Sequence, residues 1–164
     1  MTFPMANNKF WLPVTVLLLR VLASRGQVVS NADSTAVLQT TNKLFAVFKQ
    51  PTQQQFDALA ADRINCSLCA DQDAQAGSRI ELPYMVSRVR FFREYLQRLR
   101  GNTHVKRAYL MREVRMFHQN PETLVVLVAT WLPGEYQGSE GAQLELDFTK
   151  KDHKYLFSGI STIP

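Results

Sequence analysis

The chain has 164 residues, of which 46% are hydrophobic and 20% charged, with 7 Gly, 7 Pro and 2 Cys. This composition excludes collagen, disulfide-dense mini-proteins, coiled-coil rods and disordered chains, and it leaves one domain of ordinary size. No segment reaches the roughly 18 unbroken apolar residues of a membrane span. The net charge of +5 falls to +2 without residues 1–26, which hold Lys9, Arg20, Arg25 and no acid. The remaining excess gives little support to nucleic-acid binding.

Residues 1–26 have the features of a cleaved signal peptide. Phe10 to Leu19 is an apolar block of suitable length, and Lys9 gives the segment a weakly positive start. Small residues suited to cleavage follow at Ala23, Ser24 and Gly26. Arg20 interrupts the apolar stretch, so an uncleaved anchor or a buried N-terminal helix is the alternative. We expect cleavage, and therefore a secreted domain at 27–164 that is not attached to a membrane.

Two features near residue 66 agree with secretion. Asn65-Cys66-Ser67 fits the N-glycosylation pattern. Cys66 and Cys69 have the spacing of a thioredoxin-like redox pair, but no βαβ pattern surrounds them. A local disulfide, or two packed thiols, is the favoured interpretation. A zinc site needs four ligands, and the chain has no second cysteine pair and only scattered histidines, so we predict neither a metal nor a cofactor.

The first half of the chain predicts three helices and two short strands. Apolar residues recur at helical spacing up to Gln50, and Pro51 ends this helix and opens a shorter one. The clearest helix follows Pro83, where Met85, Val89 and Phe92 begin one continuous apolar face. The predicted helices cover residues 33–50, 52–61 and 84–100, and the short strands cover 64–70 and 79–82 with a loop at 71–78.

Five arginines share the third helix: Arg88, Arg90, Arg93, Arg98 and Arg100. One hypothesis makes them a strip that binds phosphate or heparin. The other is a solvated helix face whose late arginines suit the negative helix C-terminus. No cluster of Lys and Arg interleaved with aromatic residues indicates nucleic-acid stacking. The sequence favours the solvated face and predicts no nucleic-acid partner.

Four long strands complete the chain, at 105–118, 123–132, 143–150 and 155–162. Helices followed by consecutive strands predict an α+β domain, in which a curved antiparallel sheet wraps the helices on one face. The strand at 123–132 is apolar on both faces, with Leu124, Val126 and Val128 on one side and Val125, Leu127, Ala129 and Trp131 on the other. Because the chain offers no obvious second cover, we expect a homodimer through the outer sheet face.

This order of elements resembles the nuclear transport factor 2-like superfamily over residues 33–162. The ending, Leu144-Glu145-Leu146-Asp147-Phe148 through Lys154-Tyr155-Leu156-Phe157-Ser158-Gly159, is similar to the closing hairpin of secreted nematode members, whose roles are mostly undefined. The resemblance implies a cone-shaped fold of residues 27–164, with a pocket at its open end between the long helix and the concave face of the sheet.

Arg112 stands in an otherwise apolar row of the predicted strand 105–118. It could bind an anionic ligand, be neutralised by Glu113 or another acid through a strand bulge, or reach water near a sheet edge, and the last is favoured because long cationic side chains extend readily to solvent. Asp62 is the acid that would approach a cone-like pocket. The candidate pocket residues are Arg112, Asp62, Leu110, Val114 and Phe92.

No catalytic constellation can be assembled from the spacing of Ser, His and acidic residues, and no Gly-rich phosphate loop is present in the sequence. Two function classes remain open. The favoured one is a secreted non-enzymatic domain that binds a small apolar ligand or a protein partner. The alternative is an isomerase or lyase similar to ketosteroid isomerases, which would use a carboxylate in its pocket.

Overall fold

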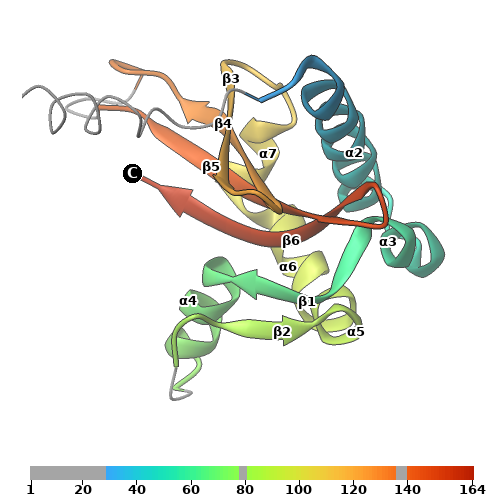
Figure 1. Ribbon diagram of the computed structural model, residues 1–164. Coiled ribbons are helices and arrows are strands. Elements are labelled where there is room, and N and C mark those ends of the chain that lie inside the picture. The colour runs from blue at the N-terminus through green and yellow to red at the C-terminus, as the bar shows by residue number, and fades with distance from the viewer. Residues whose placement is uncertain (1–28, 78–80, 136–139) are drawn as a thin grey trace, which may run out of the picture.

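The computed structural model describes residues 29–77, 81–135 and 140–164, so the predicted signal peptide at 1–26 lies outside the described residues. In the described part, a curved and unclosed six-stranded sheet packs against helices on one face (Figure 1). The predicted α+β class is therefore confirmed. None of the helices described has the length and apolar character needed to cross a membrane.

The helical elements are α2 (Asn31–Lys49), α3 (Gln53–Leu59), α4 (Ser67–Gln75), α5 (Arg88–Arg90), the π-helical turn η1 (Phe91–Tyr95), α6 (Leu96–Gly101) and α7 (Thr103–Ala108). The strands are β1 (Ala60–Cys66), β2 (Met85–Ser87), β3 (Val114–Asn120), β4 (Thr123–Trp131), β5 (Ala142–Lys151) and β6 (Lys154–Ile163).

The strands lie in the order β2-β1-β6-β5-β4-β3. The four long strands β3 to β6 pair antiparallel as predicted, and the short β1 pairs antiparallel with β2 but parallel with β6. Register shifts interrupt the ladders of β4 with β5 and of β5 with β6. Such bulges bend strands and increase their twist, which fits the curvature of the sheet around the helices.

Helix α2 forms where the sequence predicts it. Ser30 is the N-cap, and its hydroxyl accepts a hydrogen bond from the Asp33 amide at 3.0 Å. The buried face of the helix carries Val37, Leu44, Phe45, Val47 and Phe48. The helix ends before Pro51, and α3 begins two residues later. This part of the prediction is confirmed, because helical spacing and capping residues agree.

The segment from 60 to 87 differs from its prediction. The strand runs over Ala60–Cys66 and not over 64–70, and residues 67–75, expected as strand end and loop, form α4. Cys66 caps this helix, since its sulfur accepts a hydrogen bond from the Cys69 amide. The returning strand is β2 at Met85–Ser87, and most of the predicted segment at 79–82 precedes it outside regular structure or outside the described residues.

The predicted strand at 105–118 is wrong in its first half. Asn102 caps a helix there, because its side-chain oxygen accepts a hydrogen bond from the Val105 amide at 3.2 Å, and α7 follows. Met111 and Glu113 then adopt positive φ angles of 50° and 39°, which end any extended run. The strand begins only at Val114.

Candidate functional site

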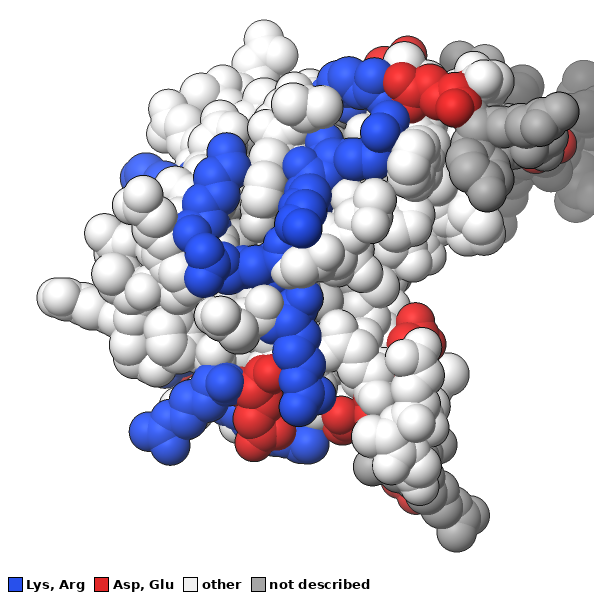
Figure 2. All heavy atoms as spheres, turned by 180° about the vertical axis from the view of Figure 1, so that it is seen from behind, with Lys and Arg blue, Asp and Glu red and all other residues white. Residues whose placement is uncertain are grey.

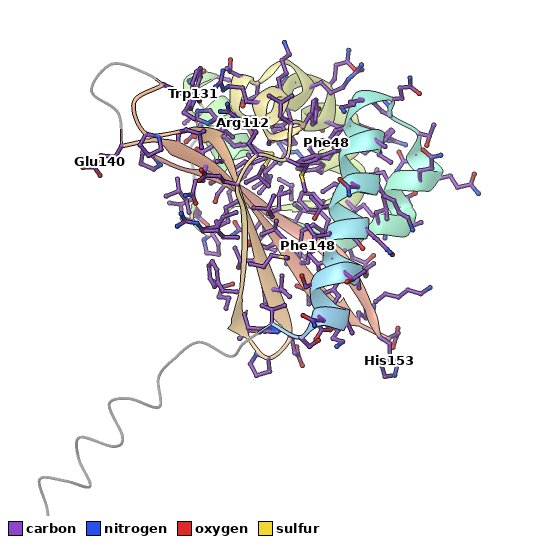
Figure 3. The ribbon with its side chains drawn as sticks, turned by 90° about the horizontal axis from the view of Figure 1, so that it is seen from above. Phe48, Arg112, Trp131, Glu140, Phe148 and His153 are labelled. Atoms are coloured by element: carbon purple, nitrogen blue, oxygen red, sulfur yellow. A yellow bond between two sulfur atoms is a disulfide. The ribbon has the colours of Figure 1, made fainter. Side chains whose placement is uncertain are left out.

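The space between the helices and the sheet is filled by aromatic side chains. Phe48, Phe56, Phe91, Phe148 and Phe157 are all fully buried. Phe56 stacks on Phe91 at a centroid distance of 5.5 Å, and Phe157 meets Phe91 at 5.7 Å. Figure 3 shows Phe48 and Phe148 between the helices and the strands. The interior of the described fold is therefore a packed aromatic core, and the main hollow lies on the surface.

An open groove of about 630 Å³ lies between α2, α3 and the turn that joins β5 to β6. Its apolar lining, called the floor below, consists of three alanines with Val47, Leu59 and Leu156, and uncharged polar side chains also line the groove: Gln39, Thr40 and Gln55. The three alanines are Ala36, Ala46 and Ala58. Small residues on the outward side of two helices leave room where larger ones would fill it. The volume falls within the range of about 300 to 1,000 Å³ that is usual for ligand sites.

The rim of the groove is cationic. Lys43 of α2 and Lys154 of β6 line it, together with His153 of the turn. All three side chains are exposed, and neither lysine forms an ion pair with a described acid. Among the residues that the structure describes, no Asp or Glu lines the groove. The arrangement offers an apolar surface beside two positive charges that have no partner in the described residues.

One end of the groove is fixed by Asp33 at the start of α2. Its Oδ1 accepts hydrogen bonds from the Tyr155 hydroxyl at 2.7 Å and from Lys150 Nζ at 2.9 Å. These bonds, with one from Ser30, hold the pKa of Asp33 far below its usual value. The contacts connect α2 with the β5–β6 hairpin, so the two walls of the groove are held at a set separation.

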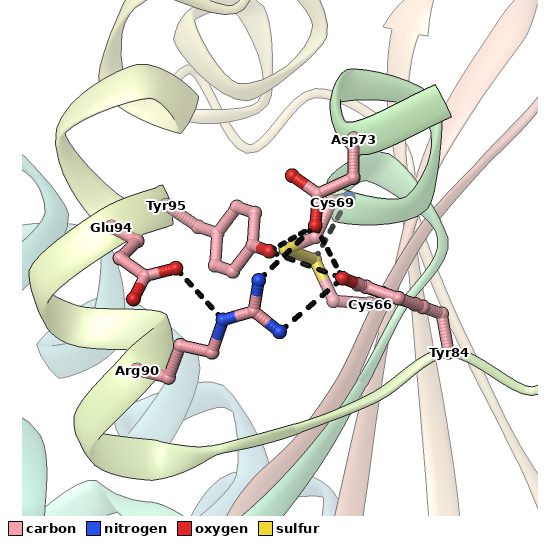
Figure 4. Close-up of polar contacts among 7 residues, drawn as sticks. All are labelled: Cys66, Cys69, Asp73, Tyr84, Arg90, Glu94 and Tyr95. Carbon is pink, nitrogen blue, oxygen red and sulfur yellow. Dashed lines mark hydrogen bonds and ion pairs between the residues drawn. A yellow bond between two sulfur atoms is a disulfide. The ribbon is translucent and has the colours of Figure 1, made fainter. Parts of the chain in front are cut away.

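A second polar cluster joins α4 to the helix that follows β2 (Figure 4). Asp73 accepts hydrogen bonds from the hydroxyl groups of Tyr84 and Tyr95 and pairs with Arg90 at 3.3 Å. Glu94 also forms an ion pair with Arg90, with Oε2 2.7 Å from Arg90 Nε. The phenol bonds, chiefly that of Tyr84, lower the pKa of Asp73, whereas burial raises the pKa of Tyr95 above its usual value.

The Asp73 cluster has the composition of a proton-transfer site but not its geometry. The hydroxyl groups of Tyr84 and Tyr95 both donate their hydrogen bonds to the carboxylate of Asp73, and Tyr95 is fully buried. Of the residues in the cluster, only Tyr84 borders a described hollow, a wide polar one of about 450 Å³ that also involves Glu81. The cluster therefore acts as a clamp that holds α4 against η1.

The predicted pocket residues do not meet in one place. Arg112 forms two hydrogen bonds of 2.6 Å with Glu135, not with Glu113, and its pKa is raised mainly by that contact. Asp62 is 75% exposed and pairs with Arg88 at 3.2 Å, beside a small hollow of about 200 Å³. Leu110 is 65% exposed. Only Val114 and Phe92 pack against the core.

Glu135 is a residue that sequence reasoning missed. Besides Arg112, it accepts hydrogen bonds from Arg107 at 2.7 Å and from the Leu132 amide at 2.9 Å, and these contacts lower its pKa to about 2. Arg107 in turn lies over the Trp131 ring at 3.7 Å. Figure 3 shows Arg112 and Trp131 near each other at the end of the molecule opposite His153. No spacing signal in the sequence connects Glu135 to these arginines, because the contact depends on α7.

Cys66 and Cys69 form a disulfide at the junction of β1 and α4, and both are fully buried. The junction of strand and helix was missed in the sequence, where helix was expected before the pair. Asn65 is half-buried within β1, which pairs with β2 on one side and with β6 on the other. Glycosylation of Asn65 stays a prediction. Among the described residues, no group of three or more His, Cys, Asp or Glu could hold a metal ion.

No family model and no curated protein matches the chain. Among solved structures, the chain is similar to a designed nuclear transport factor 2-like protein at 14% identity and a TM-score of 0.44. The match covers 81% of this chain and all of the other. A score of 0.44 assigns neither a family nor a function, so the description of the fold stands on the sheet and helices themselves.

Proposed function

We propose that this chain is a non-enzymatic binding domain whose surface groove holds an amphipathic ligand, an apolar chain that ends in an anionic group. The observation that carries the proposal is the combination of an apolar floor with Lys43 and Lys154, two lysines without an acidic partner in the described residues. The floor would take the apolar part of the ligand, since each buried methylene contributes about 0.8 kcal/mol. The lysines would take the charge.

Dodecanoate and dodecanol have the same apolar chain, but only dodecanoate carries a negative charge. Comparing their binding therefore distinguishes the role of the apolar floor from that of the two lysines. We expect calorimetry to show that dodecanoate binds more tightly than the neutral alcohol. The double variant Lys43→Gln/Lys154→Gln should weaken dodecanoate binding about tenfold, roughly the 1.4 kcal/mol of one charge-assisted contact, and leave dodecanol unchanged. Arg63→Gln/Lys151→Gln is the matched control, because it removes two exposed charges that do not line the groove. Equal binding of acid and alcohol would contradict the proposal.

An isomerase or lyase activity has less support. It would need a carboxylate in a water-excluded cavity, close to a bound substrate. Asp62 is largely exposed and paired, and the carboxylate of Asp73 is occupied by two phenols and Arg90. The described lining of the groove contains no acid. A binding role uses what the groove offers without requiring such a group.

We also propose that the domain works outside the cell and pairs with a second copy. The disulfide supports export, because such bonds persist in oxidising compartments. For pairing, the outer face of the sheet leaves Phe117 and Ile163 42% and 37% exposed, and it carries Arg115 on β3 and Glu145 on β5 with no ion pair between them. A two-fold axis would bring Arg115 of each copy toward Glu145 of the other.

Sedimentation tests the pairing. We expect a dimer at micromolar concentration that dissociates in Arg115→Glu and re-forms when Arg115→Glu is combined with Glu145→Arg. A monomer at all concentrations would contradict it. Intact mass of the protein recovered from its native source tests export, since a mature chain that starts near residue 27 is expected, and one that retains residues 1–26 would argue against it.

A further inference from the structure

Positive charge is concentrated in one stretch of this chain. Between residues 88 and 112, eight Lys and Arg residues stand against one acid, Glu94. The described residues as a whole are nearly neutral, because all 14 acids lie within them and four cations, Lys9, Arg20, Arg25 and Arg79, lie outside. The fold therefore separates charge, and acids dominate elsewhere.

Half of these cations are already neutralised by partners. Arg88 pairs with Asp57 and Asp62, and Arg90 pairs with Asp73 and Glu94. Arg107 and Arg112 share Glu135. Four are left with no ion pair to a described acid: Arg93, Arg98, Arg100 and Lys106. Lys49, at the C-terminal end of α2, is in the same condition and joins them. We call these five residues the basic band.

Contacts bring Lys49 and Arg100 of the basic band together, and the surface view shows that Lys and Arg side chains gather on one face. Seen from behind, Lys and Arg side chains form a nearly continuous band across the molecule, with few acids between them (Figure 2). The Tyr109 ring, at the end of α7, lies 4.7 Å from Lys49 Nζ and also feels the charge of Arg100, so the cations of α2 and α6 meet there. Helices α6 and α7 pack against each other.

The band exists because residues 103–108 are helical. As a strand, this segment would carry Lys106 into the sheet. As α7, it turns back against α6 and adds its charge to that of Arg98 and Arg100. The hypothesis of a solvated arginine face considered only one helix. The structure extends the charge without ion pairs over α2, η1, α6 and α7, and like charges that outnumber the acids near them favour binding of a polyanion.

We propose that the basic band binds a sulfated polysaccharide. Arginine forks match the oxygen atoms of sulfate groups, and a chain that carries many such groups can contact all five residues at once. Single-stranded nucleic acid fits less well, because its bases stack on exposed aromatic rings, and the aromatic residues near the band are buried or half-buried. Phe117, the exposed aromatic among the described large apolar residues, lies on β3, in the sheet.

Heparin chromatography and titration with a heparin fragment test the proposal. We expect retention that falls steeply with NaCl concentration, because bound counterions are released. Arg93→Gln/Arg98→Gln/Lys106→Gln changes exposed side chains without ion pairs, so the fold should persist, and far-ultraviolet circular dichroism checks this. The slope of log affinity against log salt should drop by about two to three, since each lost contact removes roughly 0.7 to 0.9.

Arg63→Glu/Lys151→Gln provides the matched control, because it changes two exposed side chains outside the basic band and the proposed dimer contact and gives the same net charge. It should keep at least two thirds of the wild-type slope. An equal loss in both variants would reduce the effect to net charge and overturn the proposal. Tighter binding to duplex DNA, to single-stranded DNA or to phosphatidylserine vesicles than to heparin at equal salt would overturn the choice of partner.

Discussion

Replacing Asp147 by Asn perturbs a buried carboxylate on the outer face of the sheet. Asp147 lies on β5 between Val125 of β4 and Gly159 of β6. Its Oδ1 is buried and has no hydrogen-bond partner among the described residues. Burial, with a smaller contribution from the nearby Glu145 charge, raises the pKa of Asp147 to about 6. The folded state therefore opposes ionisation of this side chain.

The sign of the pH effect follows from this shift. Between the unfolded pKa near 3.8 and the folded pKa near 6, the folded state keeps a proton that the unfolded state has lost. Stability must then fall as pH rises through this window and level off above about pH 7. Two pKa units correspond to roughly 3 kcal/mol, which partial solvent screening reduces to about 2 kcal/mol. Asn cannot ionise, so the variant should escape this loss.

Urea denaturation from pH 4.5 to 7.5 measures the difference between wild type and Asp147→Asn, at a protein concentration at which sedimentation shows monomer. The variant should gain about 2 kcal/mol relative to wild type across this range. Taking the difference in the free energy of unfolding between the two proteins cancels the contributions that they share. These include the contributions of carboxylates with a lowered pKa, such as Asp33 and Asp73, whose stabilising effect is lost only at lower pH. Asp152→Asn, in the exposed turn, is the control and should show no such trend. Parallel curves for wild type and Asp147→Asn would refute the reasoning.

Three further variants test particular contacts. Gly159→Ala should lower the melting temperature, because a Cβ there would lie 2.2 Å from Oδ2 of Asp147, and combining it with Asp147→Ser should restore part of the loss. Cys66→Ala/Cys69→Ala should cost about 2 kcal/mol in urea unfolding, and reductant should destabilise wild type but not this variant. Glu135→Gln should speed hydrogen exchange at the main-chain amide that donates to it, whereas exchange within β5 should stay unchanged.

The elements that the sequence predicts well are those in which local and long-range signals agree. Helix α2 combines a Ser30 cap, helical apolar spacing and a proline just past its end. Strand β5 alternates Leu144, Leu146 and Phe148, all fully buried, with half-buried polar residues. In both, the pattern that forms the element also selects its buried face, so sequence alone finds both.

The misread segments are those in which a short polar signal overrides a longer apolar one. Residues 105–118 are rich in β-forming side chains, but the Asn102 cap starts α7 and the left-handed Met111 and Glu113 delay the strand. Likewise, the Cys66 sulfur and the disulfide favour a helix start at Ser67. Capping acts through one hydrogen bond of about 1 kcal/mol, too small to dominate a composition window yet enough to place an element boundary.

The groove and the basic band depend on segments whose structure the sequence mispredicts, or on residues that give no recognisable signal in the sequence. The groove exists because small residues such as Ala46 and Ala58 line it. Alanines on a helix form no pattern in the sequence that would predict a binding site. The basic band needs α7 to bring Lys106 beside α6 and needs Glu135 to take up Arg107 and Arg112, so that the remaining cations stay free of described acids. Counting charges along the chain cannot separate paired from unpaired arginines, because Arg107 and Arg112 find their acid, Glu135, more than twenty positions away. For that reason, a charge-matched variant made elsewhere on the surface is a stronger test of each proposal than a change in net charge.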